Sequence, residues 1–393
     1  MSQLDTLAPE FVGERLRIAR EARGLTQQDA ASVIDAARTT LVAIEKGQRR
    51  VRMPELRKLV QLYRTTVNAL LREQSIHVEL APRFRKLPAS HNTSAAHAAL
   101  LLSDLAKAEV ELENVLGIAR SRSFPPERPL LPGDVRMQAE NDAIELRQRL
   151  GLSQAPIQDI VSLLEFELGV RVYVREDIDH KISGLFVFDD KLGPCILLNG
   201  KHPKTRRAHT AAHECGHFVS TRRDAEILEL DEQENSREER YANAFARAFL
   251  TPARAVKEKF MEVTAGADRL TRRHVIFLAT YFGVSIEAMV RRLEELELTK
   301  SGTWDWFVSN GGITEEHVRQ VLGNSPARER DMAPSFASTL RLNMMAAEAY
   351  RQELMSEGQL SALLRMDRVS LREMIGNLDQ EGSEVDDAPF LPA

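Results

Sequence analysis

The chain has 393 residues, of which 43% are hydrophobic and 28% charged, and its formal net charge is −5. These proportions are those of a globular protein and exclude a disordered or fibrous chain. At about 100–200 residues per domain, the length predicts two or three domains. Two cysteines, Cys195 and Cys215, are too few for a disulfide framework, and Met1–Glu10 has no signal-peptide pattern. No apolar run approaches the roughly 18 residues of a membrane span, so we expect a cytoplasmic protein without a membrane segment.

Positive charge is concentrated near the N-terminus. Residues 1–74 carry 13 Lys and Arg against 9 Asp and Glu, a local charge of +4 that leaves −9 on the remainder. An acidic average can therefore hide a basic domain, and nucleic acid stays a candidate partner.

Two short helices joined by a turn are predicted between residues 24 and 47. Thr26 is placed to cap the first helix, and Gly47 is placed to end the second. The apolar residues that fit the inward positions of the two crossing helices are Val33, Leu41 and Ile44.

These features resemble the XRE-type, or lambda-repressor-like, DNA-binding domain. The segments Gly24-Leu-Thr-Gln27 and Ile44-Glu-Lys-Gly47 occur in the family's order, followed by a closing helix at Pro54–Leu71. Asp35 stands where the family often has Gly in the turn, although Asp tolerates a left-handed backbone better than most residues. The resemblance implies an all-α helix-turn-helix bundle over residues 1–74 that binds double-stranded operator DNA.

The resemblance also implies which residues contact DNA. They are Gln27, Arg38, Thr39, Val42, Arg49 and Arg50, with Arg52 as a further phosphate candidate. Arg38, Thr39 and Val42 lie at the start and outer face of the second helix, where the family reads base edges. Gln27 would contact a phosphate or brace the reading helix. The alternative is a helical bundle that binds only protein and carries Arg49–Arg52 as a solvated cluster.

Residues 75–134 are assigned to a helical segment and a Pro-rich linker. Apolar residues recur there at intervals of four and three, as in a heptad seam, at Leu101, Leu105, Ala108, Leu112, Val115 and Ala119. Three heptads are close to the minimum for a coiled coil, so dimerisation and packing within the chain are equal alternatives. The first alternative gives a homodimer. Four prolines between Arg120 and Gly133 predict a stiff spacer.

The segment His213-Glu-Cys-Gly-His217 has the spacing of a metal site. Side chains four residues apart share one face of a helix, so His213 and His217 can bind one Zn²⁺. Glu214 lies beside them and can act as general base toward a water molecule at the metal.

The elements around this motif closely resemble the ImmA/IrrE family of metallopeptidases. The matching segments are Ile182-Ser-Gly184, Ile196–Asn199, His213–His217 and Glu239–Ala246 with Leu250-Thr-Pro252. The resemblance implies an α+β, zincin-like peptidase domain with a small antiparallel sheet, which we place at residues 135–260. It makes Glu239 the third ligand of a His₂Glu zinc site, with Glu238 as the runner-up.

Members of this family cut proteins, notably DNA-binding repressors. The resemblance therefore implies a signal-dependent, gluzincin-like zinc metallo-endopeptidase that cleaves itself or a partner repressor and controls stress-response or mobile-element genes. Single-stranded DNA or another ligand is a candidate signal. We expect the strand Cys195–Asn199 or its neighbour to offer a free edge to a substrate strand. The alternative is a transcription factor whose zinc domain cuts nothing and senses a ligand or stress.

Two residues near the motif have simpler interpretations. His209 continues the stripe of His213, but it is more typical of a core histidine or of one that supports a ligand. Cys215 could be a thiolate ligand or a redox sensor, and we favour a small buried side chain.

A helical C-terminal region is predicted over residues 261–378, followed by an acidic tail at 379–393 that we expect to be disordered. Leu278–Leu293, with Ser285 as a cap, and Ser356–Arg372 both have helix-turn-helix spacing, and for both we favour packing over DNA contact.

The only tryptophans, Trp304 and Trp306, are expected to pack against the peptidase domain rather than to anchor a partner. The whole chain is thus expected to be multi-domain and mainly α-helical.

Overall fold

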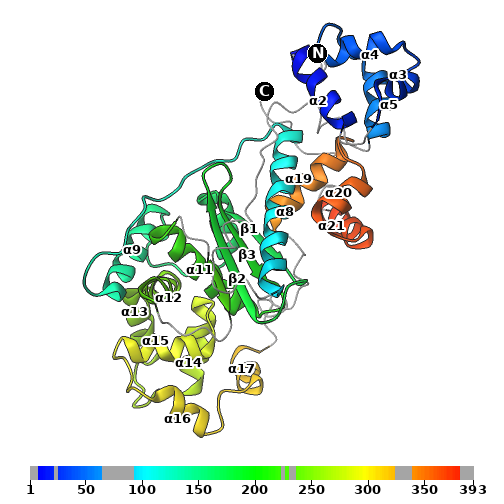
Figure 1. Ribbon diagram of the computed structural model, residues 1–393. Coiled ribbons are helices and arrows are strands. Elements are labelled where there is room, and N and C mark those ends of the chain that lie inside the picture. The colour runs from blue at the N-terminus through cyan, green and yellow to red at the C-terminus, as the bar shows by residue number, and fades with distance from the viewer. Residues whose placement is uncertain are drawn as a thin grey trace, which may run out of the picture. The chain divides into compact units, whose positions relative to one another are not determined.

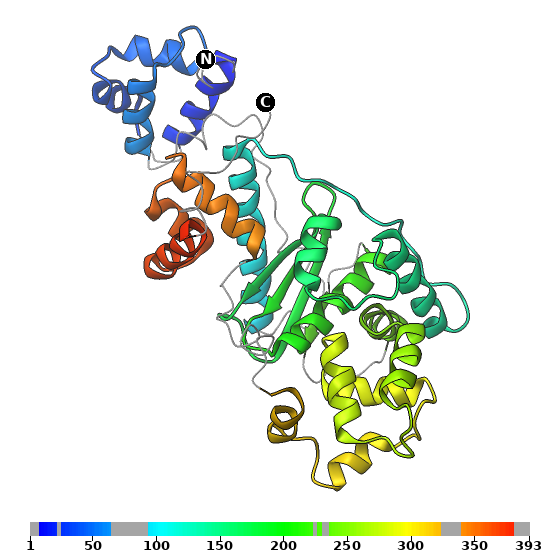
Figure 2. The same cartoon turned by 180° about the vertical axis from the view of Figure 1, so that it is seen from behind.

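The computed structural model describes residues 8–21, 25–63, 93–222, 226–229, 236–323 and 339–380 (Figures 1 and 2). It divides into two compact units, Met1–His77 and Val78–Ala393. Both are mainly helical, which confirms the predicted fold class. The predictions for Gly24, for the closing helix beyond residue 63 and for the tail beyond residue 380 lie outside the described residues.

The described part of the first unit consists of helices. They are α2 (Pro9–Glu21), α3 (Gln27–Val33), α4 (Arg38–Glu45) and α5 (Met53–Tyr63). As predicted, Thr26 caps α3, in a capping box with Asp29. Asp35, in the turn between α3 and α4, has a φ of 54°, so Asp adopts the left-handed conformation that this turn requires. Gly47, with a φ of 70°, follows the end of α4.

The apolar core of this unit lies between its helices. It contains Val12, Leu16, Ala30, Ala31, Ile34, Leu41, Ile44, Val51, Leu56, Leu59, Val60 and Tyr63. Leu41 and Ile44 are buried as predicted, but the prediction for Val33 was wrong, because 37% of its surface is exposed. Ala30 and Ile34 are four residues apart and share the inward face, whereas Val33 lies about 100° around from Ile34.

A four-stranded mixed sheet organises the second unit. Its strands are β1 (Arg171–Arg175), β2 (Ile182–Asp189), β3 (Gly193–Asn199) and β4 (Glu226–Glu229), in the order β1-β3-β2-β4. β2 and β3 form an antiparallel hairpin, but the prediction of an antiparallel sheet was wrong for β1, which pairs parallel with β3. The chain reverses from β1 to β2 and again to β3, and β3 inserts between them, so it runs in the direction of β1. β3 is thus paired on both sides and is not a free edge.

Helices cover both faces of the sheet. Ile196 and Leu198 of β3 pack in the main core with residues of α11 (Lys204–Ser220) and α12 (Arg237–Leu250). Cys195 and Leu197 alternate to the opposite face and are equally buried. α8 (Thr93–Leu116) contacts the sheet and runs along it on the side away from α11 (Figures 1 and 2).

The remaining helices form two groups. The first group includes α9, which packs against α12, and consists of α9 (Val135–Arg149), α10 (Ile160–Ser162), the π-helical turn η2 (Leu163–Glu167), α13 (Ala253–Val263), α14 (Arg272–Phe282), α15 (Ile286–Glu295), α16 (Thr303–Ser309) and α17 (Glu315–Leu322). Beside α8 lie α19 (Leu340–Arg351), α20 (Glu357–Leu364) and α21 (Arg368–Gln380). Leu278 of α14 and Leu293 of α15 belong to the main core, so this core continues past residue 260.

Within the described ranges, no single helix is long and apolar enough to cross a membrane. α14 and α15 meet the length and hydropathy test only together, as a pair bent by 100°. The two tryptophans of α16 differ in burial. Trp304 packs beside the cluster of Val275, Val290 and Phe307. Trp306 is 56% exposed, so the prediction of burial was wrong for Trp306.

Four of the six residues predicted for the heptad seam are buried inside the chain, whereas Val115 is half-buried and Ala119 is exposed beyond the end of α8. Leu101, Leu105, Ala108 and Leu112 of α8 have 0–1% of their surface exposed. α8 packs against β1, β2 and β3 and against α19 and α20. Of the two alternatives, the structure shows packing within the chain, so these four residues provide no surface for a dimer.

The Pro-rich segment also lies against the second unit. The backbone N–H of Arg128 donates to the carbonyl of Val219 at 2.7 Å, and Arg222 donates to the carbonyl of Pro125 at 2.7 Å. The prolines therefore stiffen a strap across the end of α11 rather than a free spacer.

A buried ion cluster joins α8 to β1 and α19. Glu109 of α8 accepts hydrogen bonds from Tyr173 at 2.5 Å and from Arg120 at 2.9 Å, and it pairs with Arg171 at 3.0 Å and with Arg341 of α19. Burial alone would raise the pKa of Glu109, but the arginines overcome this and lower it to about 2. The charged carboxylate of Glu109 thus connects α8, β1 and α19.

Replacement of Glu109 by Gln is expected to lower the free energy of unfolding of the second unit by about 3–5 kcal/mol, because it leaves buried arginine charge uncompensated. Unfolding of the full chain in guanidinium chloride, followed by tryptophan fluorescence, reports on this unit, since both tryptophans lie in it. Glu258→Gln, which breaks the exposed pair with Arg254, is the matched control and should leave the transition nearly unchanged. Equal shifts in the two variants would show that the cluster adds no particular stability.

Candidate metal centre and DNA-reading helix

Three side chains converge between α11 and α12. His213 and His217 lie one turn apart on α11, with their Nε2 atoms 3.1 Å apart. Glu239, in the first turn of α12, places Oε2 3.3 Å from Nε2 of His213 and Oε1 3.3 Å from Nε2 of His217. The structure therefore brings together the three residues that the sequence predicted as metal ligands. Among the described residues, Glu238 is not part of this group.

Polar side chains orient both imidazoles. Asn243, one turn after Glu239 on α12, places Oδ1 3.0 Å from Nδ1 of His213. Asn243 thus orients the imidazole of His213 through Nδ1, and Nε2 faces Glu239. Nδ1 of His217 lies 3.3 Å from Oγ1 of Thr221. Sequence reasoning gave Asn243 no role, although its spacing of four from Glu239 was a usable signal.

The electrostatics keep the carboxylate charged and His213 neutral. Burial alone would raise the pKa of Glu239, but hydrogen bonds from His213 and His217 overcome this and hold it well below its usual range. Burial lowers the pKa of His213, against the opposing hydrogen bond to Glu239. The group thus presents one anion and a neutral imidazole, the form in which histidine binds a metal.

Glu214 is completely buried on α11, against β2. A Cβ atom on Gly184 of β2 would lie 3.0 Å from Oε1 of Glu214 and 2.5 Å from Cγ2 of Thr210. On the side of α12, a Cβ atom on Gly216 would lie 3.0 Å from the Cα atom of Ala242. Two glycines therefore set how closely α11 approaches β2 and α12, and hence where the metal centre lies between them.

His209 and Cys215 lie outside the converging group. Burial, together with His213, lowers the pKa of His209 to about 3, which keeps this imidazole neutral. Cys215 is buried in the main core, and burial raises the pKa of its thiol to about 12. A thiolate is thus disfavoured, in agreement with the interpretation as a small core side chain.

In the first unit, Gln27 connects α3 to both ends of α4. Its Nε2 donates to Glu45 at 3.0 Å, and its Oε1 accepts from Arg38 at 3.3 Å. Glu45 is buried and also accepts from Arg20 at 2.7 Å. Of the two roles considered for Gln27, bracing of the reading helix is the one that these contacts support.

The outer face of α4 carries the three residues proposed to read bases. Arg38 and Thr39 are exposed at the start of the helix, and Val42 is half-buried one turn later. The buried residues Leu41 and Ile44 lie on the opposite side, so the helix presents this face to solvent within the unit.

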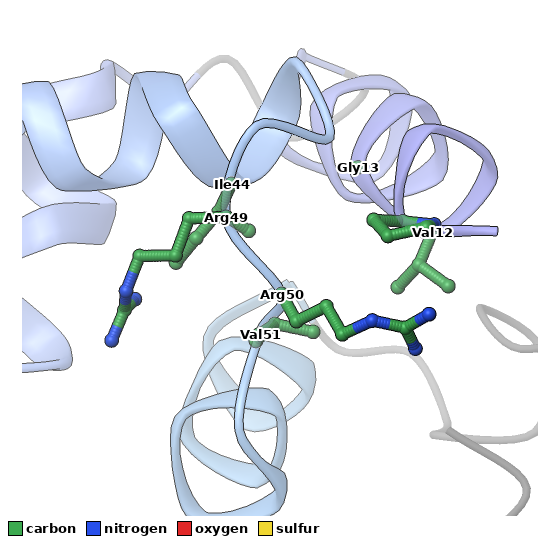
Figure 3. Close-up of a pocket in the computed structure, with 7 residues that line it drawn as sticks. Val12, Gly13, Ile44, Arg49, Arg50 and Val51 are labelled. Atoms are coloured by element: carbon green, nitrogen blue, oxygen red, sulfur yellow. The ribbon is translucent and has the colours of Figure 1, made fainter. Parts of the chain in front are cut away.

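The two arginines after α4 differ in their surroundings. Arg49 and Arg50 point in opposite directions from the chain between α4 and α5 (Figure 3). Arg49 pairs with Glu55 of α5 at 2.7 Å, whereas Arg50 is exposed. Arg49 therefore braces the start of α5 in the DNA-free protein.

The fold and the converging residues define a regulator with a protease-like domain. The chain matches the family model described as a helix-turn-helix domain over residues 12–73 and the one described as an IrrE N-terminal-like domain over residues 167–294. It thus joins a helix-turn-helix DNA-binding domain to a peptidase-like domain of the IrrE type, the fusion that the sequence predicted. The second match includes α13, α14 and α15.

No curated protein matches the sequence significantly. Among solved structures, the apo form of the competence regulator ComR from Streptococcus vestibularis aligns with 96% of this chain and 99% of its own, at 8% identity and a TM-score of 0.16. This similarity is too low to support a conclusion about fold or function.

Replacement of Gly184 by Ala is expected to destabilise the second unit by about 1–3 kcal/mol, because the new methyl group meets Thr210 and Glu214 at less than contact distance. Gly376→Ala in α21 is the control, since no atom lies near its Cβ position and Ala favours a helix. Thermal unfolding followed by circular dichroism compares the variants. An unchanged midpoint for Gly184→Ala would contradict the close approach of α11 to β2.

Proposed function

We propose that this protein is a DNA-binding transcription regulator whose second unit is a zinc metallo-endopeptidase. Cleavage of itself or of a partner repressor would change the expression of stress-response or mobile-element genes. The observation that carries the proposal is the convergence of His213, His217 and Glu239 beside the buried Glu214.

The donor set fits Zn²⁺. Two imidazoles and one carboxylate hold zinc in many hydrolases and leave the fourth position to water. The contact of Asn243 with Nδ1 of His213 is of the kind that orients a metal-binding imidazole. When bound, Zn²⁺ lowers the pKa of a water molecule and polarises a carbonyl group, so it supplies the nucleophile at neutral pH.

The role of Glu214 is proton transfer. Its carboxylate would accept a proton from the attacking water and deliver it to the leaving amide nitrogen, as the C–N bond breaks to give a carboxylate and an amine. Burial between α11 and β2 holds this side chain in place, and His213 and His217 follow from the same helix.

The substrate strand is proposed to add at β4. β3 and its hairpin neighbour β2 are each paired on both sides, so neither offers the free edge first expected, whereas β4 pairs antiparallel with β2 and places Leu228 opposite Gly184. β4 is therefore the edge strand next to β2, and β2 is the strand that contacts Glu214. Main-chain hydrogen bonds there would hold an extended peptide.

Burial of the centre favours control by a signal. His213, His217 and Glu214 have 0–1% of their surface exposed. A protein substrate therefore needs a rearrangement before it reaches these atoms, and single-stranded DNA or another ligand would supply the free energy for it. The same burial supports the alternative function, a transcription factor whose zinc domain senses a ligand and cuts nothing.

Glu214→Gln is expected to keep one zinc ion per chain and to slow peptide cleavage by about 10²–10⁴-fold, because only the proton acceptor is lost. His213→Ala should lose the zinc as well. The tests are elemental analysis of the purified full chain and gel electrophoresis after incubation with candidate signals, including single-stranded DNA. Undiminished cleavage by Glu214→Gln would remove Glu214 from the chemistry. Bound zinc without cleavage under every signal would favour the sensor.

Arg38→Ala is expected to weaken operator binding by about 1–3 kcal/mol and to relax specificity at one base pair, because Arg38 stands at the exposed start of α4. Binding is measured by fluorescence anisotropy with a duplex selected from a random pool. Arg57→Ala, on the exposed side of α5, removes the same charge outside α4 and is the control. An unchanged affinity for Arg38→Ala would exclude this residue from the reading face.

A further inference from the structure

The three C-terminal helices repeat the residue spacing of the first helix-turn-helix. α3 and α4 begin at residues 27 and 38, and α20 and α21 begin at residues 357 and 368, a constant difference of 330. The preceding helices end at Glu21 and Arg351 and obey the same difference. The two segments therefore have helices and connections of matching length.

The local geometry repeats at the same positions. A capping box opens each first helix, with Thr26 and Asp29 in α3 and with Ser356 and Gln359 in α20. In the turn, Asp35 has a φ of 54° and its counterpart Arg365 has a φ of 50°. The backbone N–H groups of residues 36 and 366 donate to the carbonyl groups of residues 31 and 361, at 3.0 and 3.1 Å.

Burial follows the same register. The pairs of apolar residues with less than 8% of their surface exposed in both segments are Val12 and Leu342, Leu16 and Ala346, Ala30 and Leu360, Ile34 and Leu364, Leu41 and Leu371, and Ile44 and Met374. The inward faces of the three helices thus correspond. The buried ion pair of Arg20 and Glu45 has no ionic counterpart, because Tyr350 and Ile375 occupy those positions.

The outward face of α21 corresponds to the reading face of α4. Arg368, Val369 and Arg372 occupy the positions of Arg38, Thr39 and Val42. All three are exposed, Val369 by 63% and the side chain of Arg372 by 66%.

A side chain from the preceding helix also reaches each reading helix. Glu357, the counterpart of Gln27, accepts from Arg372 at 2.9 Å, as Gln27 accepts from Arg38. In both segments, the first residue of one helix therefore holds an arginine on the outward face of the next.

The segment is attached to the second unit by its other helices. α19 and α20 pack against α8, and α21 packs against α19 and α20. Arg175 of β1 donates to the carbonyl groups of Leu364 and Arg365 in the turn, both at 2.8 Å. The orange and red helices of Figures 1 and 2 show this attachment beside α8.

A third turn of this kind, between α14 and α15, shows that exposure of the second helix decides whether it can contact DNA. Gly283 has a φ of 67°, and Val284 donates to the carbonyl of Ala279 at 3.0 Å, the same turn geometry. However, the counterpart of Val42 is Val290, which is completely buried against Phe307 of α16. α15 therefore cannot present this face to a groove, whereas α21 can.

We propose that α19–α21 is a second module that binds double-stranded DNA, with α21 in the major groove and Arg368, Val369 and Arg372 toward the base edges. Arginine hydrogen-bonds guanine, and an apolar side chain contacts the methyl group of thymine. The chain then holds two duplex segments, one on each unit. The module is independent of the proposed peptidase activity.

A disulfide cross-link tests the placement of α21. The two native cysteines are buried, so Val369→Cys gives the full chain one exposed thiol. The probe is a pool of duplexes of mixed sequence that carry a disulfide-activated thiol tether on a major-groove base. Val369→Cys and Thr39→Cys should both form cross-links, and Met261→Cys, 62% exposed on α13, should not.

The outcomes separate the two modules. A Val369→Cys yield no higher than that of Met261→Cys, with Thr39→Cys still reactive, would overturn the second module and leave the first intact. A disulfide between two copies of Val369→Cys, without cross-linked DNA, would assign this face to a second copy of the chain and equally overturn the proposal.

A charge reversal gives the second readout. In the Arg38→Ala background, Arg368→Glu should lower the remaining duplex affinity of the full chain about tenfold or more and flatten its salt dependence. Arg254→Glu, an exposed arginine on α13, makes the same charge change and should leave the affinity unchanged. Equal affinities of Arg368→Glu and Arg254→Glu would contradict a DNA-binding role for α21.

Discussion

The close approach of α11 to its two neighbours is the constraint on which the candidate metal centre depends. Gly184 lets β2 come within reach of Glu214, and Gly216 lets α12 come within reach of the histidines. Each close contact places one carboxylate of the candidate site, since Glu214 lies between α11 and β2 and Glu239 bridges from α12 to the histidines. A methyl group at either glycine would push an element outward by tenths of an ångström, while a metal site tolerates very little displacement of its ligands. The packing of α11 against β2 and α12 therefore determines the geometry of the candidate site.

On the other face of the sheet, β1 buries a charged side chain, Arg171. Arg171 and Tyr173 alternate with the apolar residues of β1 and point away from α11. They are satisfied by Glu109 of α8, which in turn binds Arg341 of α19. An ion cluster of this kind has directional requirements that an apolar contact lacks, so it fixes the rotation of α8 on the sheet. It also ties the C-terminal helices to the strands that carry the metal centre on their opposite side.

Sequence reasoning succeeded where the chemistry is local and failed where it depends on the fold. The convergence of His213 and His217 follows from one helical turn, and the left-handed turn at Asp35 follows from residue type. Glu239 came only from family resemblance, because nothing local says that α12 packs on α11. The seam of α8 has the same period for a coiled coil and for packing on a sheet, so periodicity could not choose between them. The direction of β1 depends on which strand inserts beside it, and a list of strands does not contain that information.

The turns after α3, α14 and α20 share one backbone geometry but precede helices with different exposure. Their backbones agree in hydrogen bonds and in the left-handed residue, so a pattern alone treats them as equivalent. What separates them is the residue one turn into the second helix, which is half-buried at Val42, covered at Val290 and exposed at Arg372. Because α16 covers the outer face of α15, the pair of α14 and α15 serves to pack the core, as short helix pairs often do. On α21, Arg372 pairs within the described chain only with Glu357 at the edge of the outward face, Val369 is 63% exposed, and a ligand that fits two arginines and a valine on such a face is the DNA groove.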